Sequence, residues 1–212
     1  MFTDASPRAL EQLAASTHQR SFASGASVFL EGSTGDELFV VVDGLVKLFS
    51  TSRDGDQLAY RTVGVGGTFG ELSAIDGHPR SAAAEALRPT RLLPVPGTAL
   101  RAALRTDHEL AESVLLAVTG RLRATTRQQA DLVFLDLAGR VARHLLDHAD
   151  ADGYVETEGT QADLADLLGA SRQSVNQALR ALEREGIVTR RGRRTVVARP
   201  EDLRARAGEP AP

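Results

Sequence analysis

The chain has 212 residues, of which 42% are hydrophobic and 25% are charged, and its formal net charge is −3. This composition is typical of a globular protein with one or two domains, and it excludes intrinsic disorder and fibrous structure. Because the chain has no cysteine, it cannot form disulfides, thiolate zinc sites or cysteine-ligated iron–sulfur clusters, and it has no cysteine nucleophile.

Neither the body of the chain nor its N-terminal segment carries a membrane or secretion signal. The strongly apolar runs are short, such as Leu38 to Val42, and none approaches the roughly 18 residues of a spanning helix. The segment MFTDASPRALEQL lacks the basic and then apolar regions of a secretion signal. We therefore expect a cytoplasmic protein without a membrane partner.

The first hundred residues are predicted to form β structure. Short runs rich in Val, Leu, Phe and Thr are separated by glycine-containing turns at intervals of roughly ten residues, which is typical of a sandwich, roll or barrel. The predicted strands are Ser27 to Leu30, Glu37 to Val42, Leu45 to Ser50 and Leu58 to Val63.

A candidate anion site lies in the segment FGELSAIDGHPRSAA, from Phe69 to Ala83. Arg80 stands at the entry to a predicted buried strand, where a charge is costly unless an anion meets it. The glycines before Glu71 allow close backbone approach and precede a helical turn whose free N–H groups suit a phosphate. Glu71 could accept a hydrogen bond from a sugar hydroxyl, so the segment predicts a nucleotide monophosphate pocket. The alternative is a surface arginine in a glycine-rich loop.

One long helix is predicted after Asp107, because no proline and a single glycine occur before Leu137. One face has heptad spacing, which predicts a seam with a partner helix. A second apolar stripe would pack on the β domain. The alternative to a partner helix is a helix that is buried wholly within its own domain. The seam consists of Ala111, Leu115, Val118, Leu122, Thr125, Gln129 and Leu132, and the stripe of Leu110, Val114 and Ala117.

A helix-turn-helix pattern follows in the C-terminal part. Thr160 to Asp163 has the form of a capping box that opens a helix ending at Leu168, and Ser171 caps a second helix after a short turn. The second helix would expose polar residues near its N-terminal end, as DNA-reading helices do. These residues are Arg172, Gln173, Asn176 and Gln177.

Two predicted strands, Ile187 to Arg190 and Thr195 to Ala198, would form a hairpin wing with arginine at its tip. From Ser171 to Arg206 ten arginines stand against four acids, a local charge of +6 that leaves −9 for the rest of the chain. This asymmetry indicates a basic end that binds an anion. DNA is the obvious candidate, and a solvated arginine-rich surface is the alternative.

In combination, these motifs resemble the cyclic-AMP receptor protein group of the bacterial Crp and Fnr transcription regulators. The resemblance covers residues 7–198 and is carried by GEL followed by RSAA, by RATTRQQADLVFLDLAGRVARHLL and by GASRQSVNQALRALEREGIV. It implies an α+β fold with an N-terminal β-roll of the cyclic-nucleotide-binding jelly-roll type, a long dimerisation helix and a C-terminal winged helix-turn-helix. The implied domains are the β-roll with an N-terminal helix at 1–106, the helix and hinge at 107–136, the DNA-binding domain at 137–205 and a flexible tail at 206–212.

The resemblance also implies site residues. The ribose and phosphate ligands would come from two short segments, the adenine would meet a hydroxyl pair on the long helix, and two apolar residues would form the wall. In this order they are Gly70, Glu71, Leu72, Arg80, Ser81 and Ala82, then Thr125 and Thr126, then Leu48 and Val63. The DNA-binding residues would be Ser171, Arg172, Gln173, Gln177, Arg191, Arg193 and Arg194. Gln173 and Gln177 replace a usual acidic and a usual basic residue, which leaves the DNA sequence preference open.

The predicted function is a homodimeric DNA-binding transcription regulator under allosteric control by cyclic AMP. Its partners would be double-stranded DNA with a near-palindromic site and RNA polymerase. The alternative is a regulator of the same fold that needs no ligand or senses cyclic GMP or haem, with His78 as a candidate haem ligand. An enzyme is not expected, because GVGGTFG misses the GxGxxG spacing and Lys47, the only lysine, lies in no Walker motif.

Overall fold

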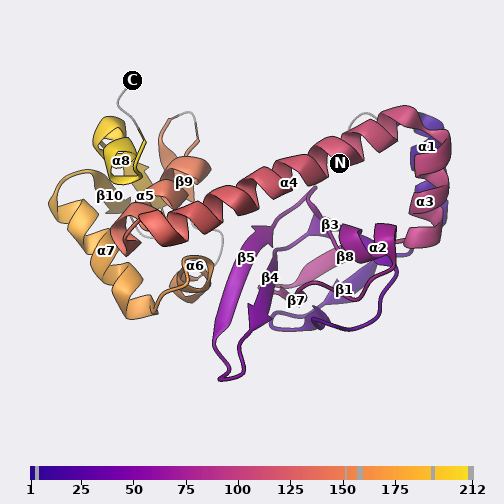
Figure 1. Ribbon diagram of the computed structural model, residues 1–212, viewed down its shortest axis with the longest axis horizontal. Helices are drawn as coiled ribbons and strands as arrows, with labels where there is room; N and C mark the ends of the chain where they lie inside the picture. Colours follow the sequence, from indigo (N-terminus) through magenta and orange to yellow (C-terminus); the bar gives the residue numbers. More distant parts are fainter. Residues whose placement is uncertain (3–4, 151, 157–159, 192–193, 210–212) are drawn as a thin grey trace. The chain divides into compact units, whose positions relative to one another are not determined.

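The computed structural model describes residues 1–2, 5–150, 152–156, 160–191 and 194–209. The chain divides into two compact units, Met1–Ala124 and Thr125–Pro212. The boundary lies inside the long helix α4 (His108–Phe134), which is labelled in Figure 1 and confirms the prediction of one helix after Asp107. Each unit has its own hydrophobic core.

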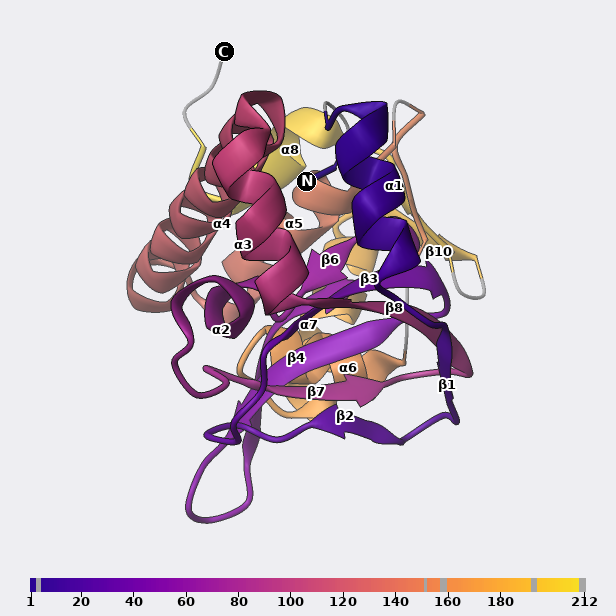
Figure 2. The same cartoon turned by 90° about the vertical axis from the view of Figure 1, so that its right-hand side faces the viewer.

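Two four-stranded antiparallel sheets form the β-roll among the described residues of the first unit (Figure 2). One sheet has the strand order β1-β8-β3-β6 and the other has the order β2-β7-β4-β5. The strands are β1 (Arg20–Phe22), β2 (Ser27–Phe29), β3 (Glu37–Asp43), β4 (Val46–Thr51), β5 (Gln57–Val63), β6 (Thr68–Phe69), β7 (Ala83–Ala86) and β8 (Thr90–Pro96).

The four strands predicted from the sequence are confirmed as β2 to β5, with ends that differ by at most one residue. The turn between β3 and β4 requires glycine. Gly44 has a φ of 103°, and a Cβ there would lie 2.2 Å from Oγ1 of Thr90. The small residues after Ser81 enter β7, where Ala83, Ala84 and Ala86 are buried, as predicted.

Helices cover one side of the roll. Figure 2 shows α1 (Pro7–Ala15) and α3 (Gly97–Thr106) side by side, and α2 (Glu71–Asp76) packs on α3 and β3. Leu110 and Val114 of α4 are buried in the same apolar cluster, which confirms that the second stripe packs on the β domain. Leu115, Leu116 and Leu122 are each about two-thirds exposed, so α4 is not buried wholly within its own unit.

The second unit contains the helix-turn-helix and a three-stranded sheet of order β10-β11-β9 among its described residues. Val141, Leu145, Val175, Leu182 and Leu203 are central in its core. The elements are α5 (Leu137–His148), β9 (Tyr154–Glu156), α6 (Gln161–Leu167), α7 (Arg172–Arg184), β10 (Val188–Arg191), β11 (Arg194–Val197) and α8 (Pro200–Arg206).

Side-chain caps begin α5, α6 and α7, and the sequence predicts those of α6 and α7. The carboxylate of Asp136 accepts from the amide of Gly139 at 2.8 Å and begins α5. Thr160 and Asp163 form the predicted capping box of α6, and Ser171 accepts from the amide of Ser174 at 3.1 Å to begin α7. A cap of this kind contributes about 1 kcal/mol to helix stability.

The sequence predicts a flexible tail at 206–212, but the described part of this segment is packed. Arg206 ends α8, and Ala207 is buried in the core of the second unit. Arg143 of α5 donates to the carbonyl of Ala207 at 2.6 Å and forms an ion pair with Glu209. Residues 210–212 lie outside the described part. The burial of Ala207 and Leu203 makes α8 and the residues after it a structural part of the unit.

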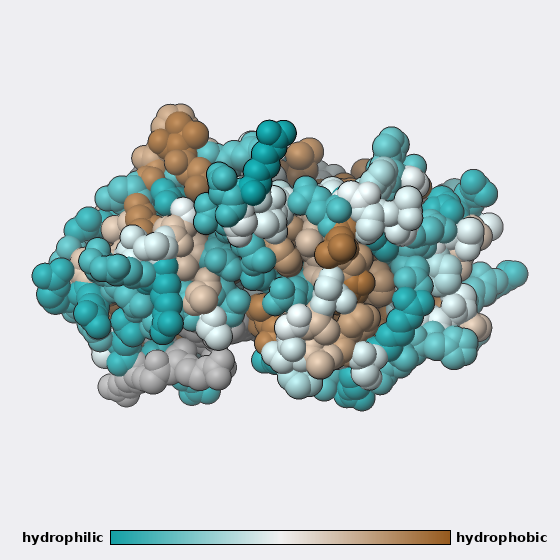
Figure 3. Space-filling view, turned by 90° about the horizontal axis from the view of Figure 1, so that it is seen from below, coloured by the Kyte–Doolittle hydropathy of each residue, from teal (hydrophilic) through white to brown (hydrophobic). Residues whose placement is uncertain are grey.

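No helix of the described residues is long and apolar enough to cross a lipid bilayer. On the face shown in Figure 3 hydrophilic residues predominate, and apolar residues gather in separate patches.

Candidate functional site

Arg80 is buried inside the β-roll, with 5% of the residue exposed, so it is not the surface arginine of the alternative interpretation. Its Nη1 donates to the carbonyls of Glu37 at 2.8 Å and Gly70 at 3.0 Å and to Oγ of Ser73 at 2.6 Å. Its guanidinium lies over the ring of Phe29, 4.2 Å from the centroid. Burial lowers the pKa of Arg80, and the negative charges of nearby acids partly offset that effect.

The Nε edge of the Arg80 guanidinium has no hydrogen-bond partner among the described residues, although Nε is buried. Gly35 leaves room for this edge, because a Cβ on Gly35 would lie 2.6 Å from Nε and 2.7 Å from Nη2. Gly70 has a φ of 77°, and a Cβ on it would lie 2.7 Å from Nη1. The glycines therefore admit the guanidinium, as a site built for an anion requires.

Glu71 begins α2 beside this arginine and is also buried, with 6% of the residue exposed. Its Oε1 forms an ion pair with Nη1 of Arg121 on α4, and its Oε2 is buried with no hydrogen-bond partner in the described part of the chain. Nη2 of Arg121 also donates to the carbonyl of Thr68 at 3.0 Å and to Oγ1 of Thr68 at 2.8 Å. The carboxylate therefore keeps one oxygen for a donor that the protein does not supply.

Arg121 and Arg61 are functional candidates that the sequence interpretation missed. Arg61 of β5 donates from Nη2 to the same Thr68 carbonyl at 3.0 Å. Burial lowers the pKa of Arg61 to about 10, the positive charge of Arg121 lowers it further, and Glu71 acts in the opposite direction. The available signal for Arg121 was its place on the long helix four residues before Thr125, since such residues share a helix face.

The remaining predicted ligand-site residues are placed as follows. Leu48 and Val63 are buried in a cluster with the aromatic rings of Phe39 and Phe69, as expected of a wall. Leu72 and Ser81 are exposed, Ala82 is half-buried, and none of the three takes part in the buried polar contacts described above. Thr125 and Thr126 are exposed on α4 and belong to the second unit, so their contact with a base stays a prediction. His78 is an exposed loop residue 3.5 Å from Asp76.

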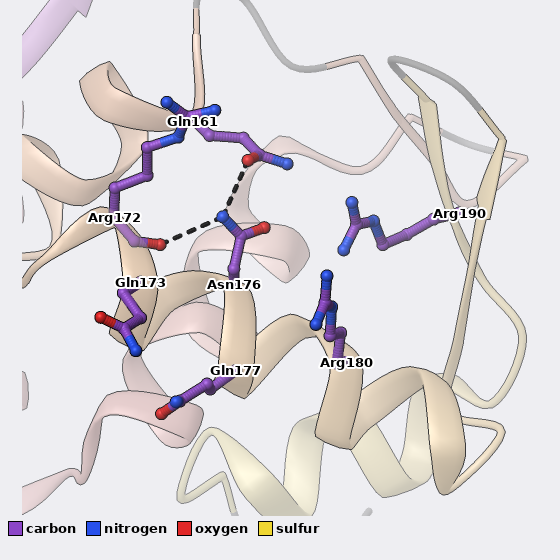
Figure 4. A pocket seen from close by; sticks show the side chains of 7 residues that line it. All are labelled: Gln161, Arg172, Gln173, Asn176, Gln177, Arg180 and Arg190. Atoms are coloured by element: carbon purple, nitrogen blue, oxygen red, sulfur yellow. Dashed lines mark hydrogen bonds between the residues drawn. The ribbon is translucent and has the colours of Figure 1, made fainter.

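The candidate nucleic-acid interface is the N-terminal half of α7 (Figure 4). Arg172, Gln173 and Gln177 are exposed there, as predicted. Asn176 is half-buried because its amide donates to Gln161 at 2.9 Å and to the carbonyl of Arg172 at 3.2 Å, which ties α7 to α6. The surface between them is a depression of about 480 Å³.

Two further arginines line this depression and were not predicted. Arg180 lies on α7, eight residues after Arg172, and Arg190 comes from β10, and Figure 4 shows both beside the polar residues of the helix. Of the predicted wing residues, Arg194 is exposed on β11, whereas Arg193 and the side chain of Arg191 lie outside the described part. In the described part, no group of three or more His, Asp or Glu residues could hold a metal ion.

Comparisons with known proteins agree with this division. The family of the cyclic nucleotide-binding domain matches residues 19–107, and that of the Crp-like helix-turn-helix domain matches residues 139–206. The chain is 33% identical to the CRP-like cAMP-activated global transcriptional regulator of Mycobacterium tuberculosis, over 98% of this chain and 96% of that protein. It is 31% identical to the cyclic AMP receptor protein of Thermus thermophilus, over 96% and 94%.

A solved structure is similar as well. The c-di-GMP responsive global regulator CLP of Xanthomonas campestris has a TM-score of 0.70 and 25% identity, covering 91% of this chain and 99% of that chain.

Proposed function

Since the chain belongs to the Crp/Fnr family of DNA-binding transcription regulators, which are not enzymes, we propose that it is a homodimer controlled by cyclic AMP. The cyclic nucleotide-binding domain and the Crp-like helix-turn-helix supply the ligand-binding and DNA-binding halves of that function. The choice of cyclic AMP is supported by the names of the relatives from Mycobacterium tuberculosis and Thermus thermophilus. A protein that binds DNA and a nucleotide second messenger would act in the cytoplasm.

The observation that carries the proposal is a pair of buried atoms without partners. Nε of Arg80 is a donor, Oε2 of Glu71 is an acceptor, and both are withheld from solvent. A buried donor or acceptor without a hydrogen bond costs about 1 to 3 kcal/mol of free energy. A ligand that pairs with both atoms would remove this cost. A cyclic nucleotide does so with its phosphate on Arg80 and a ribose hydroxyl on Glu71. Gly70, Leu72, Ser81 and Ala82 would line the same site.

The dimer would form through α4. Leu115 and Leu122 of the predicted seam are exposed in the single chain, and a second copy of the helix would bury them. The same pairing would bring Thr125 and Thr126 to the adenine, so that nucleotide binding favours one arrangement of the helices. The nucleotide would then orient two DNA-binding domains on a near-palindrome with half-sites about 34 to 36 Å apart. RNA polymerase is the partner that the family resemblance implies.

Isothermal titration calorimetry of nucleotide-stripped protein with cyclic AMP tests the proposal. We expect one site per protomer in the wild type, and at least about a tenfold loss of affinity in Arg80→Leu, since hydrogen bonds to charged groups are worth about 1.5 to 3 kcal/mol. Arg91→Leu, on the exposed side of β8, is the matched control and should bind as the wild type does. Absence of binding to the wild type, or equal binding by folded Arg80→Leu, would contradict the proposal.

A second candidate is a regulator of this fold with another ligand. The similarity to a c-di-GMP responsive regulator supports it, because related chains can then differ in the nucleotide they take. Titration with c-di-GMP and cyclic GMP under the same conditions separates the two candidates. A haem ligand at His78 is less consistent with the structure, because that imidazole is 80% exposed.

A further inference from the structure

Arg61 places a charge on the inner face of a strand that is otherwise apolar. In β5, Val63 lies two residues after Arg61 and is buried in the same apolar cluster as Leu48 of β4. Arg61 is half-buried and lies opposite Leu48 of β4, a predicted wall residue of the ligand site. The pairing of β4 and β5 is regular from Val46 to Leu48, so the alternation of the strand directs the Arg61 side chain to the same side as Val63, toward the interior of the roll.

The contacts of Arg61 do not account for its charge. Its Nη2 donates to the carbonyl of Thr68, which already accepts from Arg121. Its other N–H groups have no acceptor among the described residues, and the carboxylate of Glu71 is paired with Arg121. Burial and the like charge of Arg121 both disfavour the guanidinium, as its lowered pKa reflects. Structure alone would be served better by an apolar residue at this position.

Hydrogen bonds show on which side of the ligand site Arg61 lies. Nη1 of Arg80 donates to the carbonyl of Gly70, the residue before Glu71, whereas Arg61 donates to the carbonyl of Thr68 together with Arg121, which forms the ion pair with Glu71. Glu71 is thus connected to Arg80 through Gly70 and to Arg61 through Arg121 and Thr68. In a nucleotide the ribose joins the phosphate to the base. With the phosphate on Arg80 and the ribose on Glu71, the base extends toward Arg61.

We propose that Arg61 reads the purine base and adds affinity for 6-oxopurines, so that the site accepts a 6-oxopurine cyclic nucleotide as well as cyclic AMP, an inference that rests on the proposed cyclic-nucleotide site. A guanidinium has donors and no acceptor. The oxygen at position 6 and the nitrogen at position 7 of a 6-oxopurine are two acceptors that fit its fork, as arginine uses with guanine in DNA. Adenine offers N7 as an acceptor beside an amino group that is itself a donor, so one of the two bonds is lost.

Cyclic AMP and cyclic inosine monophosphate are the matched probes, because they share the ribose and cyclic phosphate and differ at the 6-position and the adjacent N1. Calorimetry on nucleotide-stripped full-length protein gives the ratio of the two dissociation constants. In Arg61→Leu we expect cyclic inosine monophosphate to lose about fivefold or more in affinity while cyclic AMP changes by less than about twofold. Arg61→Gln, a smaller change, should shift the ratio in the same direction, and Arg91→Leu should leave it unchanged.

The outcomes separate the two levels of the proposal. If the wild type binds neither nucleotide, both the proposed function and the role of Arg61 are overturned. If both bind and the ratio is the same in the wild type and the two folded Arg61 variants, the cyclic-nucleotide site stands and base reading by Arg61 is wrong. An equal loss for both nucleotides would give Arg61 a structural role and would also overturn base reading.

Discussion

The candidate ligand site of the β-roll and the surface of α7 use arginine in opposite ways. In the β-roll, Arg80, Arg61 and Arg121 direct their N–H groups to backbone carbonyls, hydroxyls and one carboxylate. In the helix-turn-helix, Arg172 and Arg180 are exposed along α7. The first group has been taken out of water during folding, and the second keeps its hydration until a partner arrives.

This difference decides what each arginine can recognise. A buried guanidinium is held by several acceptors, so it can distinguish ligands by geometry, and removing it leaves those acceptors unpaired. An exposed guanidinium costs little to keep and binds phosphate or base edges with a strength that depends on salt. The arginines of the ligand site should therefore matter for folding and ligand choice, and those exposed on α7 for DNA affinity and DNA discrimination.

The largest expected effect is on stability in the roll. Arg80→Leu removes the donor for the carbonyls of Glu37 and Gly70 and for Oγ of Ser73, so we expect it to destabilise the protein by about 3 kcal/mol. Arg180→Leu on the exposed surface of α7 should change stability by less than about 0.5 kcal/mol. Urea unfolding followed by circular dichroism measures both values. Equal effects of the two substitutions would remove the distinction between buried and exposed arginines.

The second expected effect is on DNA discrimination. Arg172→Ala should cost about 2 kcal/mol with the specific site and relax selectivity at one base pair in each half-site, because arginine reads guanine with two hydrogen bonds. Arg194→Ala should weaken all sequences alike and lower the salt dependence by about one unit. Fluorescence anisotropy with specific and random duplexes at several salt concentrations measures both. Equal weakening of specific and random DNA by Arg172→Ala would show that this residue does not read bases.

The third expected effect joins the two regions. Thr125→Ala together with Thr126→Ala should retain cyclic AMP binding but lose the gain in DNA affinity that the nucleotide produces, a coupling of about 1 to 2 kcal/mol. The reason is that a ligand shifts an equilibrium only through contacts that differ between the two states. DNA titrations with and without cyclic AMP give the coupling. Unchanged activation in the double variant would exclude these hydroxyls from it.

The smallest expected effect concerns His144, a half-buried histidine of α5 in the second unit. Burial and the neighbouring His148, whose ring stacks on it at 4.1 Å, lower the pKa of His144 to about 3. The unfolded chain therefore binds a proton between pH 6.5 and 3 that the folded chain rejects, so stability is full above pH 6.5 and falls as the pH drops through this window. Because the ring is partly exposed, we expect a loss under about 1 kcal/mol. Urea midpoints between pH 7 and 4 should fall less in His144→Phe than in the wild type, and parallel curves would contradict this assignment.

Local signals explain which parts of the fold were predictable. The strands β2 to β5, the long helix and the caps at Thr160 and Ser171 depend on residues close together in sequence. The turn residues, the hydrophobic periodicity and the capping residues can therefore be recognised in the sequence before the fold is known. The helix α8 was missed, because its pattern is short and most of its stabilisation comes from packing on α5.

The candidate site was predictable only in part for the same reason. Gly70, Glu71 and Arg80 lie in one glycine-rich segment whose chemistry can be interpreted directly. Arg121 donates to Thr68 across 53 positions of sequence, and the inward direction of Arg61 depends on strand register. No spacing rule connects such residues, so the two guanidiniums that flank Thr68 appear only once the roll has closed.

The packing of α8 has a consequence for the order in which the protein can fold during synthesis. Leu203 and Ala207 are fully enclosed in the core of the second unit, beside Val141 and Leu145 from its beginning. That core cannot close on the ribosome until Ala207 has left the exit tunnel. The core of the first unit draws on residues up to Val114 and Val118, so it can close while the helix-turn-helix is still being translated. The ligand-binding half can thus be complete before the DNA-binding half exists.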